Sequence, residues 1–266
     1  MIGPMLIWTD PAGRSGAANM AWDQTLLDLA EAEGRFVVRL YRWEPHCLSF
    51  GRNEPAGRRY DRARIEAEGI DVVRRPTGGR AVWHARELTY AVAAPTARLG
   101  ALQEAYRRIH EMLAAAVTAL GAAPALAARP LRAAPVDAGA CFASPAGGEL
   151  IVDGAKVVGS AQVRQGAALL QHGSMLLEDD QSLVTSLTRG AAPGSGGAPL
   201  GQLLRRRVPF DEAAAAVAAA VKDAWPGEWN ETSAAIPAEL AGTAALAARV
   251  AHHEHRFRDP AWTWHR

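Results

Sequence analysis

The stretch Arg74-Arg75-Pro76-Thr77-Gly78-Gly79-Arg80-Ala81-Val82-Trp83-His84 says more about the fold of this chain than any other segment. The mostly apolar residues just before it predict a strand that ends at the arginines. Two adjacent glycines allow φ > 0 and let a ligand lie directly against main-chain amides. The guanidinium groups can surround a polar group held there. We therefore predict a ligand-holding loop between two strands, and taken alone this loop suggests a phosphate cradle.

The familiar nucleotide-binding loops do not match this stretch. A Walker P-loop ends in Gly-Lys-Ser/Thr, and a dinucleotide-binding Rossmann loop has the pattern Gly-x-Gly-x-x-Gly. Neither pattern occurs in residues 74–84. The chemistry of the ligand has to be inferred from the rest of the chain.

The composition indicates a globular chain with a sizeable core. Its 266 residues are enough for one large domain or for a large domain with a small appendage. Hydrophobic residues make up 49% and charged residues 21%, which is typical of a folded domain. Lys and Arg (29) nearly balance Asp and Glu (28), so nucleic acid is not expected as a partner.

Targeting signals and cysteines point to the cytoplasm. The first residues lack the cationic region of a signal peptide. No stretch approaches the roughly 20 apolar residues that span a bilayer, so no membrane is expected as a partner either. The cysteines, Cys47 and Cys141, are too few for a disulfide framework, which makes a reduced cytoplasm the expected location.

Periodicity and turn residues predict an α+β fold. The predicted helices cover residues 16–33, 60–68, 102–120 and 210–225. The predicted strands cover residues 36–43, 46–53, 71–74, 88–93, 149–152, 156–161 and 167–177. Asp153-Gly154 predicts a hairpin turn, and residues 121–140 and 190–199 predict loops. Strand pairs with interspersed helices favour a mostly antiparallel or mixed sheet with flanking helices.

Cys141 and Lys156 are the candidates for covalent chemistry. Cysteine is a strong nucleophile when a nearby cation favours its thiolate, but a single cysteine can also be a small buried hydrophobe. Cys47 lies within an apolar strand, which favours the second interpretation. Lys156 stands among small and apolar residues, and Lys222 is the only other lysine. Beside a thiol it could act as a base or as a counter-ion; otherwise it would be a lysine at a sheet edge.

The histidines are candidates for hydrogen bonding rather than for metal binding. His84 ends the glycine stretch, and His172 lies in a later strand. Each could contribute to a site or could be a satisfied structural residue. The run His252-His253-Glu254-His255 lacks the His-Glu-x-x-His spacing of zinc hydrolases and is interpreted as part of a solvated tail. No metal site is expected.

Several segments together resemble the biotin/lipoate protein ligase and octanoyltransferase superfamily. Residues 74–84 with 86–90 resemble its Arg-Arg-x-x-Gly-Gly signature, and residues 154–162 resemble the signature around its invariant lysine. Residues 171–177 resemble a third signature, while 19–23 and 48–53 resemble its opening helix and strand. The resemblance implies a single catalytic domain over residues 1–266, with a ligase-like core at about 8–230 and a polar C-terminal tail at about 231–266.

Two features resemble the LipM-type octanoyltransferases more than the ATP-using ligases. Arg80 stands where ligases have a third glycine, and Cys141 stands upstream of Glu149 at the position of the acyl-thioester cysteine. The sequence departs from the family pattern at residues 144–148 and at Glu54-Pro55. These departures affect local loop contacts.

The resemblance implies an octanoyl transfer and assigns its residues. Cys141 would be the acyl-thioester nucleophile, and Lys156 would lower its pKa and serve as acid or base. The residues implied in substrate binding are Arg75, Thr77, Gly78, Gly79, Arg80, His84, Gly159, Ser160, Ala161 and His172. The apolar residues that could line an octanoyl tunnel are Val72, Val82 and Val157.

The implied donor is octanoyl-acyl carrier protein. The implied acceptor is a lysine of glycine-cleavage H protein or of a lipoyl domain. No cofactor, and hence no ATP, is expected. Three rival functions stay open, which are an ATP-dependent lipoate-protein ligase (either a single chain or one half of a split enzyme), an octanoyl amidotransferase, and a non-catalytic homologue that binds carrier proteins.

Overall fold

The computed structural model describes residues 5–127, 149–191, 196–240 and 244–265. The strands are β1 (Met5–Thr9), β2 (Phe36–Tyr41), β3 (Cys47–Phe50), β4 (Asp71–Arg74), β5 (Val82–His84), β6 (Glu87–Pro95), β7 (Pro124–Leu126), β8 (Leu150–Val152), β9 (Ala155–Gln165), β10 (Ala168–Leu176) and β11 (Trp229–Thr232). The helices are α1 (Gly16–Glu33), α2 (Ala56–Arg59), α3 (Arg62–Ala67), α4 (Thr96–Leu99), α5 (Leu102–Ala119), α6 (Ser182–Leu187), α7 (Leu200–Leu203), α8 (Phe210–Ala224), α9 (Ala244–Arg258) and α10 (Pro260–Thr263). None of these helices is long and apolar enough to cross a bilayer.

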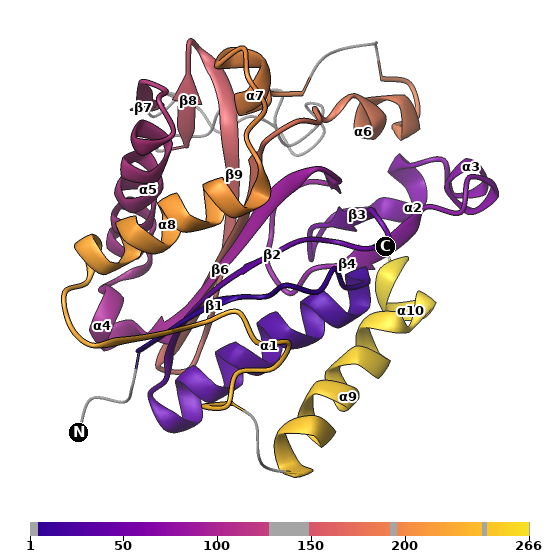
Figure 1. The fold of residues 1–266 in the computed structure, drawn as a ribbon. Coiled ribbons are helices and arrows are strands. Elements are labelled where there is room, and N and C mark those ends of the chain that lie inside the picture. The colour runs from indigo at the N-terminus through magenta and orange to yellow at the C-terminus, as the bar shows by residue number, and fades with distance from the viewer. Residues whose placement is uncertain (1–4, 128–148, 192–195, 241–243, 266) are drawn as a thin grey trace.

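The strands form a large mixed sheet and a small one (Figure 1). The large sheet has the order β11-β1-β2-β6-β10-β9-β8-β7, and the small sheet has the order β4-β3-β5. In the large sheet β1 runs parallel to β2 and β11, while the other neighbours run antiparallel. The predicted α+β class with a mixed sheet is therefore confirmed.

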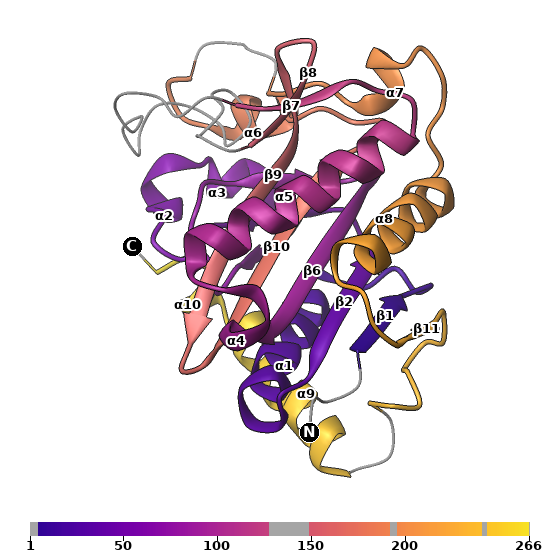
Figure 2. The same cartoon turned by 90° about the vertical axis from the view of Figure 1, so that its left-hand side faces the viewer.

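The large sheet is covered by helices on both faces (Figures 1 and 2). Alternate residues of β6 show this directly. Leu88, Tyr90 and Val92 pack in the core formed with α5 and α8. Ala91 and Ala93 pack in the core formed with α1. Because successive side chains of a strand point to opposite faces, β6 is apolar along most of its length.

Local sequence signals explain where the elements that frame the site begin and end. α1 starts after Ser15, whose side chain accepts a hydrogen bond from the amide of Ala18, and it ends at Gly34 with φ of 69°. The β8–β9 hairpin turns at Asp153 and Gly154, both of which have positive φ. This is the geometry that an Asp-Gly turn favours, and it fixes the register of β9.

Two predictions about loops and tails need correction. The segment predicted as a loop at residues 121–140 contains β7, which pairs with β8, and its remainder from residue 128 lies outside the described residues. The region predicted as a solvated tail contains α9 and α10. Phe257 of α9 is fully buried in the core with α1, and His253 contacts Asp28 at 2.7 Å. The polar sequence of α9 concealed an apolar stripe that covers the outer face of α1.

The small sheet presents the glycine motif to the large sheet. β4 enters the motif and β5 leaves it, while β3 pairs with both strands. A side chain at Gly51, just after β3, would place its Cβ 1.9 Å from the carbonyl oxygen of Gly79. The turn after β3 therefore lies directly against the glycine motif. This close approach closes one side of a pocket that lies between the two sheets.

Candidate active site

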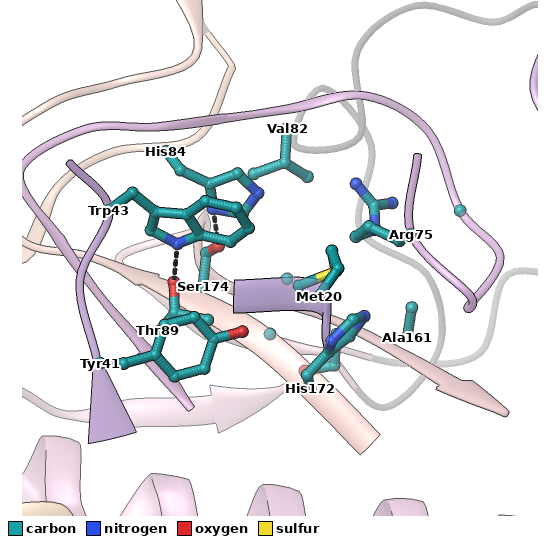
Figure 3. A pocket seen from close by; sticks show the side chains of 14 residues that line it. Met20, Tyr41, Trp43, Arg75, Val82, His84, Thr89, Ala161, His172 and Ser174 are labelled. Atoms are coloured by element: carbon teal, nitrogen blue, oxygen red, sulfur yellow. Dashed lines mark hydrogen bonds between the residues drawn. The ribbon is translucent and has the colours of Figure 1, made fainter. Parts of the chain in front are cut away.

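A pocket lies between the glycine motif and the large sheet. It is lined by Met20, Tyr41, Trp43, Arg75, Gly79, Val82, His84, Thr89, Gly159, Ser160, Ala161, His172, Gly173 and Ser174. We call it the acyl pocket, after the group that the family resemblance implies as its ligand. In Figure 3 Trp43 and His84 lie at one end of it, and Arg75 and Ala161 lie at the other.

The floor of the acyl pocket is made of residues with little or no side chain. Gly159 and Ala161 come from β9, and Gly173 comes from β10. A Cβ at Gly173 would lie 2.3 Å from the carbonyl oxygen of Gly159, so the close strands leave no room for a larger residue. Met20 and Val82 add apolar side chains. A slender apolar group suits this shape.

Arg75 is the cationic group of the pocket, and Ser49 anchors it. Nη1 of Arg75 donates to the backbone oxygen of Ser49 at 2.9 Å and to its Oγ at 2.5 Å. Nη2 donates to the carbonyl oxygens of Gly78 and Arg80 at 3.1 and 2.9 Å. The guanidinium thus fixes the course of the glycine loop. Ser49 was not among the predicted site residues.

His84 connects the Arg75 anchor to a buried carboxylate. Its Nε2 lies 2.6 Å from Ser49 Oγ, and its Nδ1 lies 2.7 Å from Glu87 Oε1. Because the Glu87 carboxylate can only accept, Nδ1 is the donor to it, and Nε2 accepts from the Ser49 hydroxyl. The ring proton then stays on Nδ1 and bonds to Glu87. Burial lowers the pKa of His84, although the carboxylate of Glu87 opposes this shift.

His172 makes a second connection of the same kind. Its Nε2 lies 2.6 Å from Thr77 Oγ1, and its Nδ1 lies 2.7 Å from Asp23 Oδ2. Thr77 belongs to the glycine motif, whereas Asp23 belongs to α1. The histidine therefore ties the motif to the helix across the pocket. Both His84 and His172 are buried, and both line the pocket.

Asp23 also belongs to a buried cluster of ion pairs and hydrogen bonds. Arg39 of β2 is fully buried and donates to Asp10 Oδ2 at 2.7 Å, with a longer bond of 3.4 Å to Asp23 Oδ1. Tyr41 donates its hydroxyl to Asp23 Oδ2 at 2.8 Å. The sequence held one signal of this cluster, which is a single arginine within the apolar strand 36–41. It was not recognised.

Lys156 is a buried residue of β9 and not a residue at a sheet edge. It is 2% exposed, and its Nζ donates to Glu149 Oε1 at 2.6 Å. β9 lies between β8 and β10 in the sheet, so the edge interpretation is wrong. Lys156 lies three residues before Gly159 and is not among the lining residues of the described pocket. Cys141 lies outside the described residues, so its distance from Lys156 stays a prediction.

The remaining predicted residues divide into two groups. Thr77, Gly78 and Arg80 do not line the pocket, but each bonds to a residue that does, through the contacts of His172 and Arg75. Val82 lines the pocket as expected. The other two valines do not: Val72 packs against the core of the small sheet, and Val157 belongs to the core with α5 and α8.

Two further expectations concern cysteine and metal. Cys47 is fully buried in β3, and burial raises the pKa of its thiol, so the core interpretation is confirmed. Within the described ranges no group of three or more His, Cys, Asp or Glu side chains could hold a metal ion.

A third histidine with a hydroxyl partner was not predicted. His110 of α5 lies with Nε2 3.0 Å from Ser160 Oγ and Nδ1 2.8 Å from the carbonyl oxygen of Tyr106. Tyr90 extends this contact, because its hydroxyl lies 2.6 Å from Ser160 Oγ. Burial lowers the pKa of His110 to about 4. Its helical register, on the apolar face of α5 with Ile109 and Leu113, was the available signal.

Comparison with known proteins identifies the class. Residues 15–222 match the family described as the lipoyl protein ligase A/B catalytic domain, so the chain belongs to that family. A solved lipoate-protein ligase A bound with ATP has the same fold, with a TM-score of 0.77 and 18% identity over 99% of each chain. The bipartite lipoate protein ligase of Thermoplasma acidophilum is similar at a TM-score of 0.75 and 17% identity, over 98% of this chain and 96% of that one.

Curated relatives are similar in sequence as well. Octanoyltransferase LipM of Kyrpidia tusciae is 42% identical over 185 residues, which is 66% of this chain and 67% of the relative. Octanoyltransferase LipM of an Exiguobacterium strain is 39% identical over 230 residues, which is 79% of this chain and 83% of the relative. The resemblance inferred from the motifs is thereby confirmed.

Proposed function

We propose that the octanoyl transfer carried out by this acyltransferase in protein lipoylation runs through a thioester on Cys141. The donor is octanoyl-acyl carrier protein. The acceptor is the ε-amine of a lysine on a lipoyl domain or on glycine-cleavage H protein. Curated relatives that bear the name octanoyltransferase LipM support the type of reaction.

The observation that carries this proposal is the buried pair of Lys156 and Glu149. Glu149 follows Cys141 by eight residues, and Lys156 stands on the strand that also supplies Gly159 and Ala161 to the pocket. A buried ammonium favours a thiolate that approaches it, because the two charges attract strongly where water is excluded. The Glu149 carboxylate balances the Lys156 charge before the thiolate arrives.

The first half-reaction loads the enzyme. The Cys141 thiolate attacks the carbonyl carbon of the octanoyl thioester, and a new carbon–sulfur bond forms. The bond to the carrier-protein sulfur breaks, and the departing thiolate takes a proton from the Lys156 ammonium, which becomes a neutral amine. The apolar, glycine-floored pocket holds the octanoyl chain during this step and the next.

The second half-reaction unloads it. The acceptor amine attacks the carbonyl carbon of the Cys141 thioester, forms the amide bond, and expels the Cys141 thiolate. Lys156 accepts the proton that the amine loses. Exchange between thioesters is nearly isoenergetic and amide formation from a thioester is downhill, so the route needs no ATP.

An ATP-dependent lipoate ligase is the rival function, since a solved protein of this fold is a ligase bound with ATP. At 18% identity that likeness concerns the fold alone. Arg80, which stands in the motif where ligases have a third glycine, favours the transferase. Incubation with octanoyl-acyl carrier protein and H protein without ATP separates the two. Transfer supports our proposal, whereas strict dependence on ATP overturns it.

Intact-protein mass spectrometry tests the nucleophile. We expect the wild-type chain to gain one octanoyl group after mixing with octanoyl-acyl carrier protein. Cys141→Ala should not gain it. Cys47→Ala is the matched control, because Cys47 is fully buried in β3 and should leave acylation intact. An octanoyl adduct that persists in Cys141→Ala rules out the proposed thioester.

Acylation assays with two different donors distinguish the octanoyltransferase from an amidotransferase and from a non-catalytic homologue. An octanoylated H protein offered as donor distinguishes an amidotransferase, which would accept it in place of the carrier protein. A non-catalytic homologue would form no acyl-enzyme with either donor.

A further inference from the structure

Arg74, the neighbour of Arg75 in the glycine motif, does not line the acyl pocket. Its fully buried guanidinium lies among backbone carbonyl oxygens from two distant segments. Nη1 donates to Gly51 and Glu54 at 2.7 and 2.9 Å, and also to Arg52 at 3.1 Å. These acceptors form the turn that follows β3.

The second set of acceptors comes from the C-terminal end of the described chain. Nε of Arg74 donates to the carbonyl oxygens of Trp262 and Thr263 at 3.1 and 3.0 Å. Nη2 donates to the carbonyl oxygen of His265 at 2.9 Å. The indole Nε1 of Trp262 donates in return to the carbonyl oxygen of Arg74 at 3.0 Å. We call residues 259–265 the C-terminal clasp.

The clasp is held firmly by its own packing. Asp259 caps α10 by accepting from the amide of Ala261 at 2.8 Å. The Arg256 guanidinium lies 4.1 Å from the centre of the Trp262 ring. Trp264 contacts Phe50 of β3 at a ring separation of 5.2 Å. The clasp is thus fixed to both α9 and the small sheet.

The turn at residues 51–54 links the clasp to the glycine motif, which borders the acyl pocket. The amide of Arg52 donates to the carbonyl oxygen of Thr77 at 2.8 Å, and Gly51 lies against the carbonyl of Gly79. The amide of Arg75 donates to the carbonyl oxygen of Phe50 at 2.8 Å. A continuous set of contacts therefore runs from the clasp through Arg74 and the turn to the glycine motif.

We propose that the C-terminal clasp positions the glycine motif over the acyl pocket and so sets the affinity for the acyl donor. Its residues do not touch the pocket, so they act through Arg74 as positioning residues. They also lie beyond residues 15–222, the part of the chain that matches the family. The effect on the donor rests on the proposed octanoyl transfer, whereas the effect on the motif does not.

The physical reason is the cost of an unmatched buried guanidinium. Arg74 carries a charge that the carbonyl dipoles stabilise, and the two segments that supply these dipoles are far apart in the sequence. When the clasp loosens, the guanidinium must move toward water and takes the 51–54 turn with it. The glycine motif then loses its support at Thr77 and Gly79.

Trp262→Phe is the most conservative test. It keeps an aromatic ring in place and removes the hydrogen bond to the Arg74 carbonyl. Trp229→Phe is the matched control, because it removes an indole hydrogen bond of 2.9 Å to the carbonyl of Trp225, at the other side of the large sheet near α8. Both tryptophans are half-buried, so the two changes perturb similar surroundings.

Two measurements are made on both variants in the full-length chain. Hydrogen–deuterium exchange should accelerate at residues 75–82 in Trp262→Phe and stay at the wild-type rate there in Trp229→Phe. The KM for octanoyl-acyl carrier protein should rise about three- to tenfold in Trp262→Phe, as expected for one lost buried hydrogen bond, with kcat unchanged. Unchanged exchange at 75–82 in Trp262→Phe overturns the proposal, whatever the activity.

A larger change completes the test. A chain that ends at Arg258 lacks the clasp and should show both effects more strongly. If wild-type protein transfers no octanoyl group but the exchange difference is seen, the proposed function fails and the positioning role stands. If Trp262→Phe raises the exchange rate but leaves the KM at the wild-type value, the role in donor affinity is overturned.

Discussion

Three buried histidines each hold a hydroxyl group at Nε2, but they differ in the partner at Nδ1. His84 and His172 face carboxylates, Glu87 and Asp23, and both line the acyl pocket. His110 faces a backbone carbonyl and belongs to α5, on the opposite side of the large sheet from α1. The negative charge of a carboxylate favours the protonated form of its histidine, whereas a neutral carbonyl only accepts a hydrogen bond from it.

This difference separates the two histidines that line the pocket from His110, which reaches the pocket lining only through Ser160. The carboxylate-backed histidines connect the glycine motif to the body of the protein, so their contacts control the shape of the pocket. His110 donates from Nδ1 to the Tyr106 carbonyl, which fixes its tautomer, and its Nε2 pairs with the Ser160 hydroxyl beside a packed core. Four changes test this distinction, from the largest expected effect to the smallest.

Asp23→Asn should be the most damaging change. It leaves the fully buried Arg39 with one carboxylate partner fewer and removes the charged partner of His172. Breaking a buried ion pair costs about 3–5 kcal/mol, and urea unfolding measures the loss. Asp211→Asn is the control, because its pair with Arg42 is exposed and should contribute less than about 1 kcal/mol. Equal losses in the two variants would contradict the assignment of a buried cluster.

The pH dependence of stability should reveal His110. Burial lowers its folded-state pKa to about 4, below the value of about 6.5 in an unfolded chain. The unfolded chain therefore binds the proton first, and stability falls as the pH drops from about 6.5 to about 4. The contribution is about 3 kcal/mol over this window, from the size of the shift. His110→Gln should show a flatter profile than wild type between these values, and an identical profile would refute the assignment.

Ser49→Ala should weaken binding of the octanoyl donor in the pocket without unfolding the protein. The change removes the hydroxyl that joins Arg75 to His84, so we expect about a tenfold rise in the KM for the octanoyl donor. Ser49→Thr keeps the hydroxyl and should retain most of the wild-type KM. Combining Ser49→Ala with Arg75→Lys should give less than the sum of the two effects, because both act through one contact. Fully additive effects would show that Ser49 acts elsewhere.

Tyr90→Phe should have the smallest effect. It removes the hydroxyl that lies next to Ser160 and accepts from Gln171, on the His110 side of the sheet. Loss of one such bond should lower the unfolding free energy by about 1 kcal/mol. We expect the KM for the donor to stay at the wild-type value. A clear rise in that KM would place the His110 network in the pocket's function and remove the distinction between the two kinds of histidine.

Local signals predicted the frame of the site. The bounds of α1 follow from apolar spacing and from Gly34, which begins the turn that ends the helix. Asp153-Gly154 predicted the hairpin that sets the register of β9. The glycine motif and His84 were identified because residue type and neighbours are sufficient to recognise a loop of this kind.

Long-range contacts were the part that could not be predicted. His172 and Asp23 are 149 residues apart, and no local pattern marks them as partners. Arg74 and His265 are 191 residues apart, and the polar sequence of α9 hid the helix that brings them together. Ser49 looks like any polar residue in a strand until the fold places it between Arg75 and His84.

The sequence by itself determined the elements that frame the site, the glycine motif and the family, because each depends on residues that are neighbours along the chain. The tertiary structure decided which buried charges pair and which arginine of the motif faces the pocket. Those outcomes depend on the burial of groups that only the folded chain brings together, and burial is what makes their hydrogen bonds and charges matter.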